Sequence, residues 1–165
     1  MGLKIYVVQA GADGVTELDA FDAALYSAGI ANQNLVYLSS IIPEQSVIVE
    51  AEPPYTREQF GNRLYCVMAQ HRTSQIDSEA WAGIGWTQDT ESGRGLFAEA
   101  NGTSEEEVQS ALFSTLNAMA ARRPYVNWEA PHLKVSGICC RDRPVCSLVA
   151  ATYASIGWSG SGQSH

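Results

Sequence analysis

Two adjacent serines, Ser39 and Ser40, end an apolar stretch with strand-like composition, and the segment Ile41-Ile42-Pro43 follows them. A serine hydroxyl in a strained Ser-Ser bond can attack the carbonyl carbon of the preceding residue. The attack can cut the backbone and leave a ketone at the new N-terminus, so a chain can build a cofactor from its own residues. Serine pairs are common, so the pair supports this chemistry only together with its neighbours.

The elements around the pair are mostly strands, because runs of β-branched and apolar residues alternate with turn residues. Pro43 ends the strand that carries the serines, since proline supplies no donor to a strand ladder. Strands are expected at residues 3–10, 34–40, 46–51, 63–72, 79–88, 95–100, 133–140 and 145–156, with turns at 11–14 and 89–93. Two helices fall between runs of strands without regular alternation, which favours an α+β fold with residues 1–165 in one domain.

The two helices are recognised by their start signals. The first is expected at residues 17–28, where Thr16 and Asp19 resemble a capping pair and Gly29 fits the left-handed position that ends a helix. The second begins at the capping box formed by Ser104 and Glu107 and runs to about residue 121. Helical spacing predicts the inner faces as Phe21, Leu25 and Ala28 in the first helix and Val108, Ala111, Leu112, Thr115 and Met119 in the second.

The charge and hydropathy of the chain exclude some classes of partner. The net charge of −8 argues against nucleic acid, because phosphate binding needs clustered Lys and Arg. No run of 18 apolar residues exists, so no membrane span is expected. The N-terminus has no signal-peptide pattern, which predicts a cytoplasmic protein. The acidic surface fits a cationic substrate, although solubility alone also accounts for it.

The cysteines and histidines give no metal-binding pattern. The four cysteines, at positions 66, 139, 140 and 146, match no zinc spacing, and the three histidines are scattered. We expect reduced, buried thiols and no metal, with a disulfide as the open alternative. The Gly/Ser-rich residues 159–165 are expected to be a frayed tail.

Two segments resemble the pyruvoyl-dependent arginine decarboxylases. Residues 20–30 read Ala-Phe-Asp-Ala-Ala-Leu-Tyr-Ser-Ala-Gly-Ile, and residues 34–43 read Asn-Leu-Val-Tyr-Leu-Ser-Ser-Ile-Ile-Pro. A second patch, Gly-Leu-Phe-Ala-Glu at residues 95–99, is similar to the acid-bearing strand of that family. The resemblance covers about residues 5–157 and is poor at 52–75. Glu44 and Asn101 depart from the family pattern.

The resemblance implies a self-processing enzyme. The hydroxyl of Ser40 would attack the Ser39 carbonyl and cut the chain into a β chain, residues 1–39, and an α chain, residues 40–165. Ser40 would become a covalent pyruvoyl group, which forms a Schiff base with the substrate amine and acts as the electron sink for decarboxylation. The expected reaction converts L-arginine to agmatine and carbon dioxide.

Three further side chains receive roles from the resemblance. Glu99 would be the proton donor, its acidity adjusted by burial in an apolar strand, and the alternative is an ordinary surface glutamate. Asn34 would support the oxyanion during processing, and the alternative is a turn residue. Asp22 would bind the substrate guanidinium, and the alternative is a solvated helix residue.

The resemblance also implies a four-layer αββα sandwich and a homotrimer, or a dimer of trimers, with sites between subunits. Two alternative functions remain open at this point. One is a related pyruvoyl decarboxylase for another amino acid, such as histidine. The other is a non-catalytic scaffold that keeps the fold and is never cut.

Overall fold

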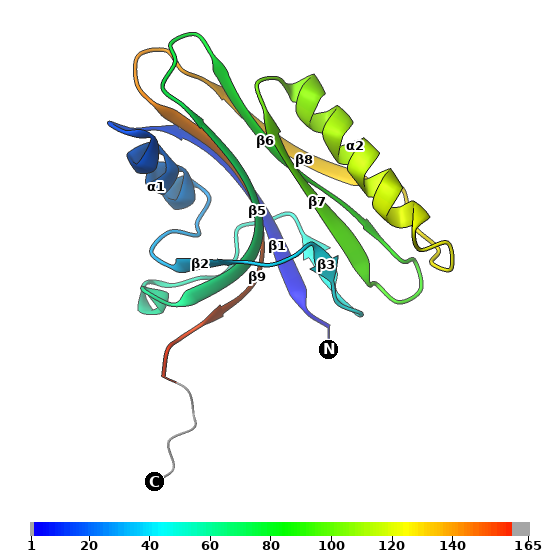
Figure 1. Cartoon of the computed structure of the whole chain (residues 1–165). Coiled ribbons are helices and arrows are strands. Elements are labelled where there is room, and N and C mark those ends of the chain that lie inside the picture. The colour runs from blue at the N-terminus through cyan, green and yellow to red at the C-terminus, as the bar shows by residue number, and fades with distance from the viewer. Residues whose placement is uncertain (1, 160–165) are drawn as a thin grey trace.

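Two β-sheets stack face to face, and each carries one helix on its outer side (Figure 1). The computed structural model describes residues 2–159. The helices are α1 (Glu17–Ser27) and α2 (Glu105–Ala121), with a short 3₁₀ helix at Arg57–Gln59. The strands are β1 (Lys4–Asp13), β2 (Asn34–Tyr37), β3 (Ile41–Ile42), β4 (Val47–Val49), β5 (Arg63–Thr73), β6 (Glu79–Gln88), β7 (Gly95–Gly102), β8 (His132–Cys139) and β9 (Val145–Ile156). This arrangement confirms the predicted four-layer αββα sandwich of the α+β class.

The first sheet has the strand order β2-β5-β9-β1-β4, and the second has β3-β7-β6-β8. Three apolar layers hold the sandwich together. Ala20, Ala24 and Leu25 of α1 pack on the outer face of the first sheet, and Val108, Leu112 and Leu116 of α2 pack on the second. Between the sheets lies the central core, which includes Ile5, Val67, Ile84, Phe97 and Val149. Burial of this apolar area is the main term that favours the fold.

The start and end of α1 follow the predicted signals. The Thr16 hydroxyl accepts a hydrogen bond from the Asp19 amide at 3.1 Å, and the Asp19 carboxylate accepts one from the Val15 amide at 2.7 Å. Gly29, at φ +76°, ends the helix in the left-handed region that glycine enters without strain. Both helix positions were therefore correctly predicted within about two residues.

Several boundaries were wrong. β1 continues to Asp13, through the predicted turn at 11–14, because it pairs with β9 along its whole second half. On α2, Ala111 and Thr115 are exposed, and Leu116 takes the inner position instead. A helix has 3.6 residues per turn, so Val108, Leu112 and Leu116 share one face at a spacing of four. The prediction is confirmed for Val108 and Leu112, and Met119 is partly buried beside them.

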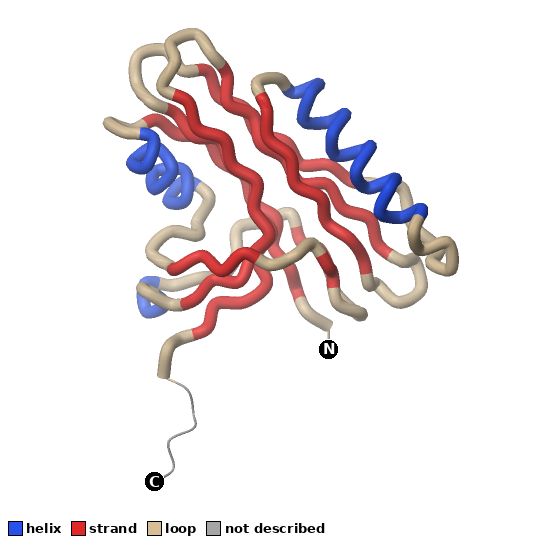
Figure 2. The backbone as a smooth tube through the Cα atoms, in the orientation of Figure 1, coloured by secondary structure: helices blue, strands red, loops and turns tan. Residues whose placement is uncertain are grey.

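The most consequential difference concerns the serine pair. The predicted strand at 34–40 ends at Tyr37, and the chain then crosses from the first sheet to the second, where Ile41 and Ile42 form β3. Figure 2 shows this crossing as a loop between two short strands. Ser39 and Ser40 therefore lie in the crossover rather than inside a strand.

The cysteines are free thiols, and Cys66, Cys140 and Cys146 are buried, as predicted. Neither helix in the described part of the chain has the length and hydropathy of a membrane span. The predicted tail at 159–165 falls, except for Ser159, outside the described residues.

Candidate active site

Backbone hydrogen bonds fix the crossover on both sides of the serine pair. The Leu38 amide donates to the Cys66 carbonyl in the first sheet at 2.9 Å. The Phe97 amide of β7 donates to the Ser40 carbonyl in the second sheet, also at 2.9 Å. The pair is therefore held between two sheets rather than by one strand ladder.

A tight turn centres on Ser40. The Ile41 amide donates to the Ser39 carbonyl at 2.7 Å, which closes a three-residue turn. This contact polarises the Ser39 carbonyl, the group that a Ser40 nucleophile would attack. An N–H donor already lies where negative charge would develop on that oxygen.

The Ser40 side chain points at Glu99. Its Oγ donates to Glu99 Oε2 at 2.9 Å. Side chains alternate along a strand, so Phe97 and Glu99 of β7 face the first sheet while Leu96 and Ala98 face α2. The fold thus brings together the serine and the acid that lie 59 positions apart in the chain.

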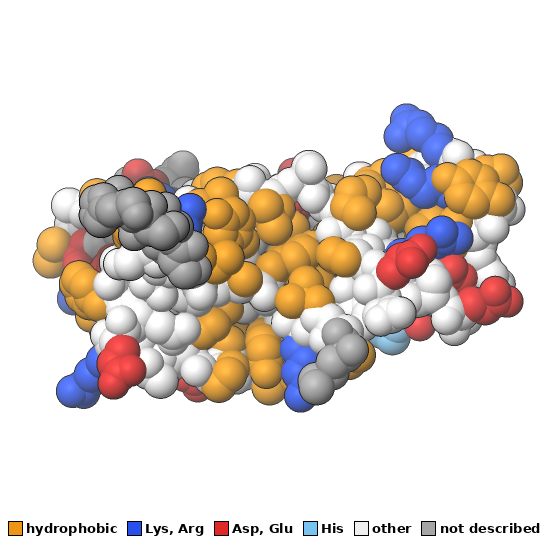
Figure 3. Space-filling view, turned by 90° about the horizontal axis from the view of Figure 1, so that it is seen from below, with side chains coloured by type: hydrophobic (Ala, Val, Ile, Leu, Met, Phe, Trp, Pro, Cys, Tyr) orange, Lys and Arg blue, Asp and Glu red, His pale blue; other side chains and the backbone are white. Residues whose placement is uncertain are grey.

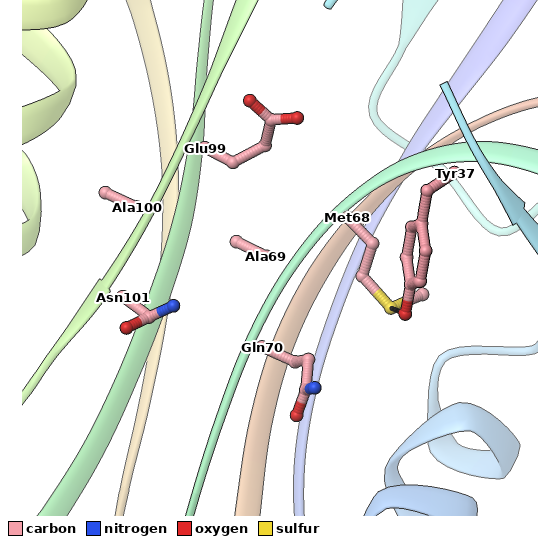
Figure 4. Close-up of a pocket in the computed structure, with 7 residues that line it drawn as sticks. All are labelled: Tyr37, Met68, Ala69, Gln70, Glu99, Ala100 and Asn101. Atoms are coloured by element: carbon pink, nitrogen blue, oxygen red, sulfur yellow. Dashed lines mark hydrogen bonds between the residues drawn. The ribbon is translucent and has the colours of Figure 1, made fainter. Parts of the chain in front are cut away.

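Beside this pair is a pocket of about 300 Å³ (Figure 4). β7 contributes Glu99 and Asn101 to its lining, and β2 and β5 contribute Tyr37, Met68 and Gln70, whose side chains lie on the other side of the β5 ribbon from Glu99. Ala69 and Ala100 complete its lining. The mixture of apolar wall and a few polar ends is typical of a small-molecule site.

The amide of Gln70 has a defined orientation. Arg72 Nε donates to Gln70 Oε1 at 2.9 Å, and an arginine side chain can only donate. The Gln70 oxygen is therefore engaged by Arg72, on the face of β5 that also carries Met68.

The pocket lies where both sheets have open edges. β2 pairs with β5 only at residues 63–66, and β3 pairs with β7 only at residues 95–96. The later parts of β5 and β7 each pair with a single strand of their sheet in the described residues. Open strand edges of this length are usually covered in a native assembly.

Tyr153 is a site residue that the sequence did not reveal. Its hydroxyl, from β9 in the first sheet, donates to the Ile41 carbonyl at 2.8 Å. Its ring contacts the Phe97 ring edge-on, with centroids 6.2 Å apart. Burial, and next the nearby Glu99 carboxylate, raise the pKa of Tyr153 above its ordinary value.

The predicted site residues separate into two groups. Ser39, Ser40 and Glu99 come together in the crossover. Asn34 lies at the start of β2, where its side-chain amide donates to the Gly61 carbonyl at 2.9 Å, remote from the serine turn. Asp22 lies exposed on α1 and is not part of the pocket lining.

One expectation about Glu99 was wrong. Its neighbours Phe97 and Ala98 are buried, but the Glu99 side chain is exposed in the single chain, because it borders the open edge and the pocket. Strand alternation could have placed Glu99 on the face opposite Ala98, but it could not reveal that this face opens to solvent.

The residues missed from the sequence gave weak signals. Tyr153 is the one large side chain in an Ala-rich run, Ala-Ala-Thr-Tyr-Ala. Gln70 and Met68 belong to a segment where the family resemblance is poor. The backbone donors at Phe97 and Ile41 carry no signal in their residue types.

Comparison with known proteins points to one family. A family model described as "Pyruvoyl-dependent arginine decarboxylase (PvlArgDC)" matches residues 4–156. A protein of that name from Thermococcus sibiricus is 32% identical over 152 residues, which cover 89% of this chain and 92% of the relative. The Pyrococcus abyssi protein of that name is 29% identical over the same shares of both chains.

A third relative of the same name, from Picrophilus torridus, is 28% identical over 72% of this chain and 65% of its own length. The family is defined by a covalently bound pyruvoyl group. A serine turn beside a carboxylate is a suitable source for that group. The chain belongs to the pyruvoyl-dependent arginine decarboxylase family.

Proposed function

We propose that the chain cuts itself between Ser39 and Ser40 and then decarboxylates L-arginine to agmatine and carbon dioxide. The observation that carries the proposal is the 2.9 Å hydrogen bond from Ser40 Oγ to Glu99 Oε2 within the polarised serine turn. Family membership supplies the substrate and the cofactor.

The cut begins when Ser40 Oγ bonds to the Ser39 carbonyl carbon and the Ser39–Ser40 peptide C–N bond breaks, which leaves an ester. The hydrogen bond to Glu99 orients the Ser40 hydroxyl, and the hydroxyl proton ends on the freed nitrogen of Ser40. The Ile41 amide supports the charge that develops on the Ser39 oxygen.

Loss of the Ser40 α-proton then breaks the Oγ–Cβ bond and releases Ser39 as a carboxylate. The dehydroalanine left at position 40 becomes an imine, and water converts it to the ketone with loss of ammonia. The oxygen of Ser40 ends on Ser39, and the ketone oxygen comes from water. No outside oxidant is needed.

The residues around Ser40 fit a small ketone at the new chain end. The carbonyl of residue 40 already accepts the Phe97 amide, and the pocket opens beside Glu99. The pyruvoyl group would take the substrate amine and withdraw the electrons released with carbon dioxide. The Phe97 amide would hold the adjacent carbonyl, and Glu99 would deliver a proton to the substrate α-carbon.

A second subunit would complete the site. Glu99 and the strand edges beside it are exposed in one chain, and Asp22 lies outside the pocket. Figure 3 shows hydrophobic side chains gathered across the centre of one face of the molecule. These features support contact with a neighbouring subunit. The family resemblance implies a homotrimer, alone or stacked in pairs, in which a neighbour would bring its Asp22 carboxylate to the substrate guanidinium.

The proposal is tested by release of carbon dioxide from L-arginine, L-histidine and L-lysine with purified, incubated protein. We expect release from arginine only, with agmatine as the second product. Release from histidine instead would assign the chain to another substrate. No release from any of the three, together with an uncut chain, would indicate the scaffold alternative.

A further inference from the structure

A bulge in the first sheet lies at Tyr153, whose side chain faces the space between the sheets. Along β5 and β9 the residue pairs run from Tyr65 with Ala154 directly to Cys66 with Thr152, so Tyr153 is the extra residue. A bulge bends the strand locally, and bulges often lie beside active sites. Tyr153 faces the same inter-sheet space as Ala151 and Val149, two and four positions before it.

Tyr153 forms a hydrogen bond with β3, the edge strand of the second sheet. β3 has two residues and, within residues 2–159, pairs on one side only, with Leu96 and Gly95 of β7. The carbonyl of Ile41 faces away from that ladder, and the Tyr153 hydroxyl donates to it at 2.8 Å. This bond ties the free side of β3 to the opposite sheet.

The hydrogen bond from Tyr153 holds Ile41, which lies close to the proposed cut between Ser39 and Ser40. The Ile41 amide donates to the Ser39 carbonyl, while the Ile41 carbonyl accepts from Tyr153. After a cut, residues 40–42 would begin a new chain, and chain ends fray unless they are fastened. A two-residue strand offers few other bonds for that purpose.

We infer that Tyr153 is a positioning residue that fastens Ile41 before and after the cut, so that residue 40 stays aligned with Ser39 and then with Glu99. This inference rests on the proposed self-processing and adds to it a residue outside the serine turn. Tyr153 acts through Ile41 and does not contact the reacting atoms.

The hydroxyl keeps its proton under working conditions. Burial and the Glu99 carboxylate both disfavour the phenolate and so raise the pKa of Tyr153. The group is therefore a constant donor at neutral pH. The edge-on contact with Phe97 fixes its ring.

The test compares Tyr153→Phe with a matched control on the same strand. Tyr153→Phe keeps the ring and removes the hydroxyl. Ser147→Ala removes another hydroxyl of β9 that also donates across the sheets, to the Ser136 carbonyl at 2.7 Å. Both variants lose one inter-sheet hydrogen bond, but only the first loses it beside the serine turn.

We expect Tyr153→Phe to slow the disappearance of the uncut chain and to lower kcat for arginine by about fivefold or more, the value of one well-placed hydrogen bond. The KM should change by less than about twofold, since the pocket itself is untouched. Ser147→Ala should lower the Tm and leave both rates at the wild-type value.

A second measurement does not depend on the cut. In the uncut Ser40→Ala background, Tyr153→Phe should speed hydrogen exchange at residues 41–42, and Ser147→Ala should not. The inference would be overturned if Tyr153→Phe kept wild-type rates of cleavage and turnover and wild-type hydrogen exchange at residues 41–42. It would also be overturned if Tyr153→Phe and Ser147→Ala slowed cleavage and turnover equally. If the wild-type chain itself stays uncut, the proposed function fails, and the exchange result still decides whether Tyr153 fastens Ile41.

Discussion

At the residue scale, the proposed chemistry depends on a few short contacts around Ser40. Its carbonyl accepts from Phe97, its hydroxyl donates to Glu99, and the flanking Ser39 carbonyl accepts from Ile41. The sequence singled out both side chains, because Ser40 and Glu99 lie in recognisable motifs, and the structure brings them into contact. It could not predict the backbone donors, since any residue type supplies an N–H group.

The role of Glu99 is tested by Glu99→Gln. The amide keeps a side chain of the same size and an oxygen that can accept from Ser40 Oγ, so the fold and the cut should persist. The amide has no acidic proton, so turnover of arginine should fall by about 100-fold or more, the usual value of a general acid. Cleavage is followed on a denaturing gel and turnover by carbon dioxide release.

Unchanged turnover in Glu99→Gln would remove Glu99 as the proton donor. The matched control is Glu105→Gln, which neutralises a carboxylate exposed at the start of α2. We expect its turnover to be normal.

At the scale of elements, the site exists because the chain changes sheets between β2 and β3. Composition predicted the apolar run at 34–42 but not its division, since Leu38 and Ile41 suit either sheet. Pairing decides the division: Leu38 bonds to Cys66 in one sheet and Ile41 pairs with Leu96 in the other. Such long-range pairing cannot be read from local residue pattern.

The inner face of α2 gives a direct test of the packing. Leu112 is fully buried against the second sheet, whereas Thr115, which periodicity also placed inward, is exposed. Leu112→Ala should lower the free energy of unfolding by about 2–5 kcal/mol through lost burial and a cavity. Thr115→Ala should change it by less than about 0.5 kcal/mol.

The two variants are compared by chemical denaturation of the same uncut Ser40→Ala chain, so that processing does not complicate the transition. An equal loss of unfolding free energy in Leu112→Ala and Thr115→Ala would show that α2 is rotated relative to the packing described above.

The thiols beneath α1 provide a second test at this scale. Burial raises the pKa of Cys66 to about 12 and that of Cys146 to about 11. The thiolate is the reactive form, so both thiols should be almost unreactive at pH 8 in the native protein. Cys139, which is partly exposed, should react first with a thiol reagent, and peptide mapping identifies the labelled residue.

Reactivity of the two buried thiols should rise toward high pH, as the thiolate becomes populated. Rapid labelling of Cys66 in folded protein at pH 8 would contradict the packing of α1 on the first sheet.

At the scale of the whole molecule, the proposed site is incomplete in a single chain. Open edges of β5 and β7, the exposed Glu99 and the remote Asp22 all point to a neighbour. A sequence motif can align Asp22 with a family position, but it carries no information about which chain of an assembly supplies it.

If two subunits share each site, variants that lack Asp22 or Glu99 should complement each other. Subunits with Asp22→Asn and subunits with Glu99→Gln should each be inactive or strongly impaired alone. Co-expressed, they should regain a measurable part of the wild-type activity, because some interfaces then hold one native Asp22 and one native Glu99. Light scattering on the wild-type protein should give three times the 17.8 kDa mass of the chain, or twice that trimer.

No recovery in the mixed protein, with normal assembly, would place both side chains in the same subunit. A monomeric mass would contradict the proposed trimer.

The central claim is self-processing at Ser40, and intact mass under denaturing conditions tests it most directly. We predict two chains, residues 1–39 and 40–165, the second lighter by one ammonia than a chain that begins with serine. Ser40→Ala should give one uncut chain. A wild-type protein that remains a single 17.8 kDa chain after long incubation would contradict the account.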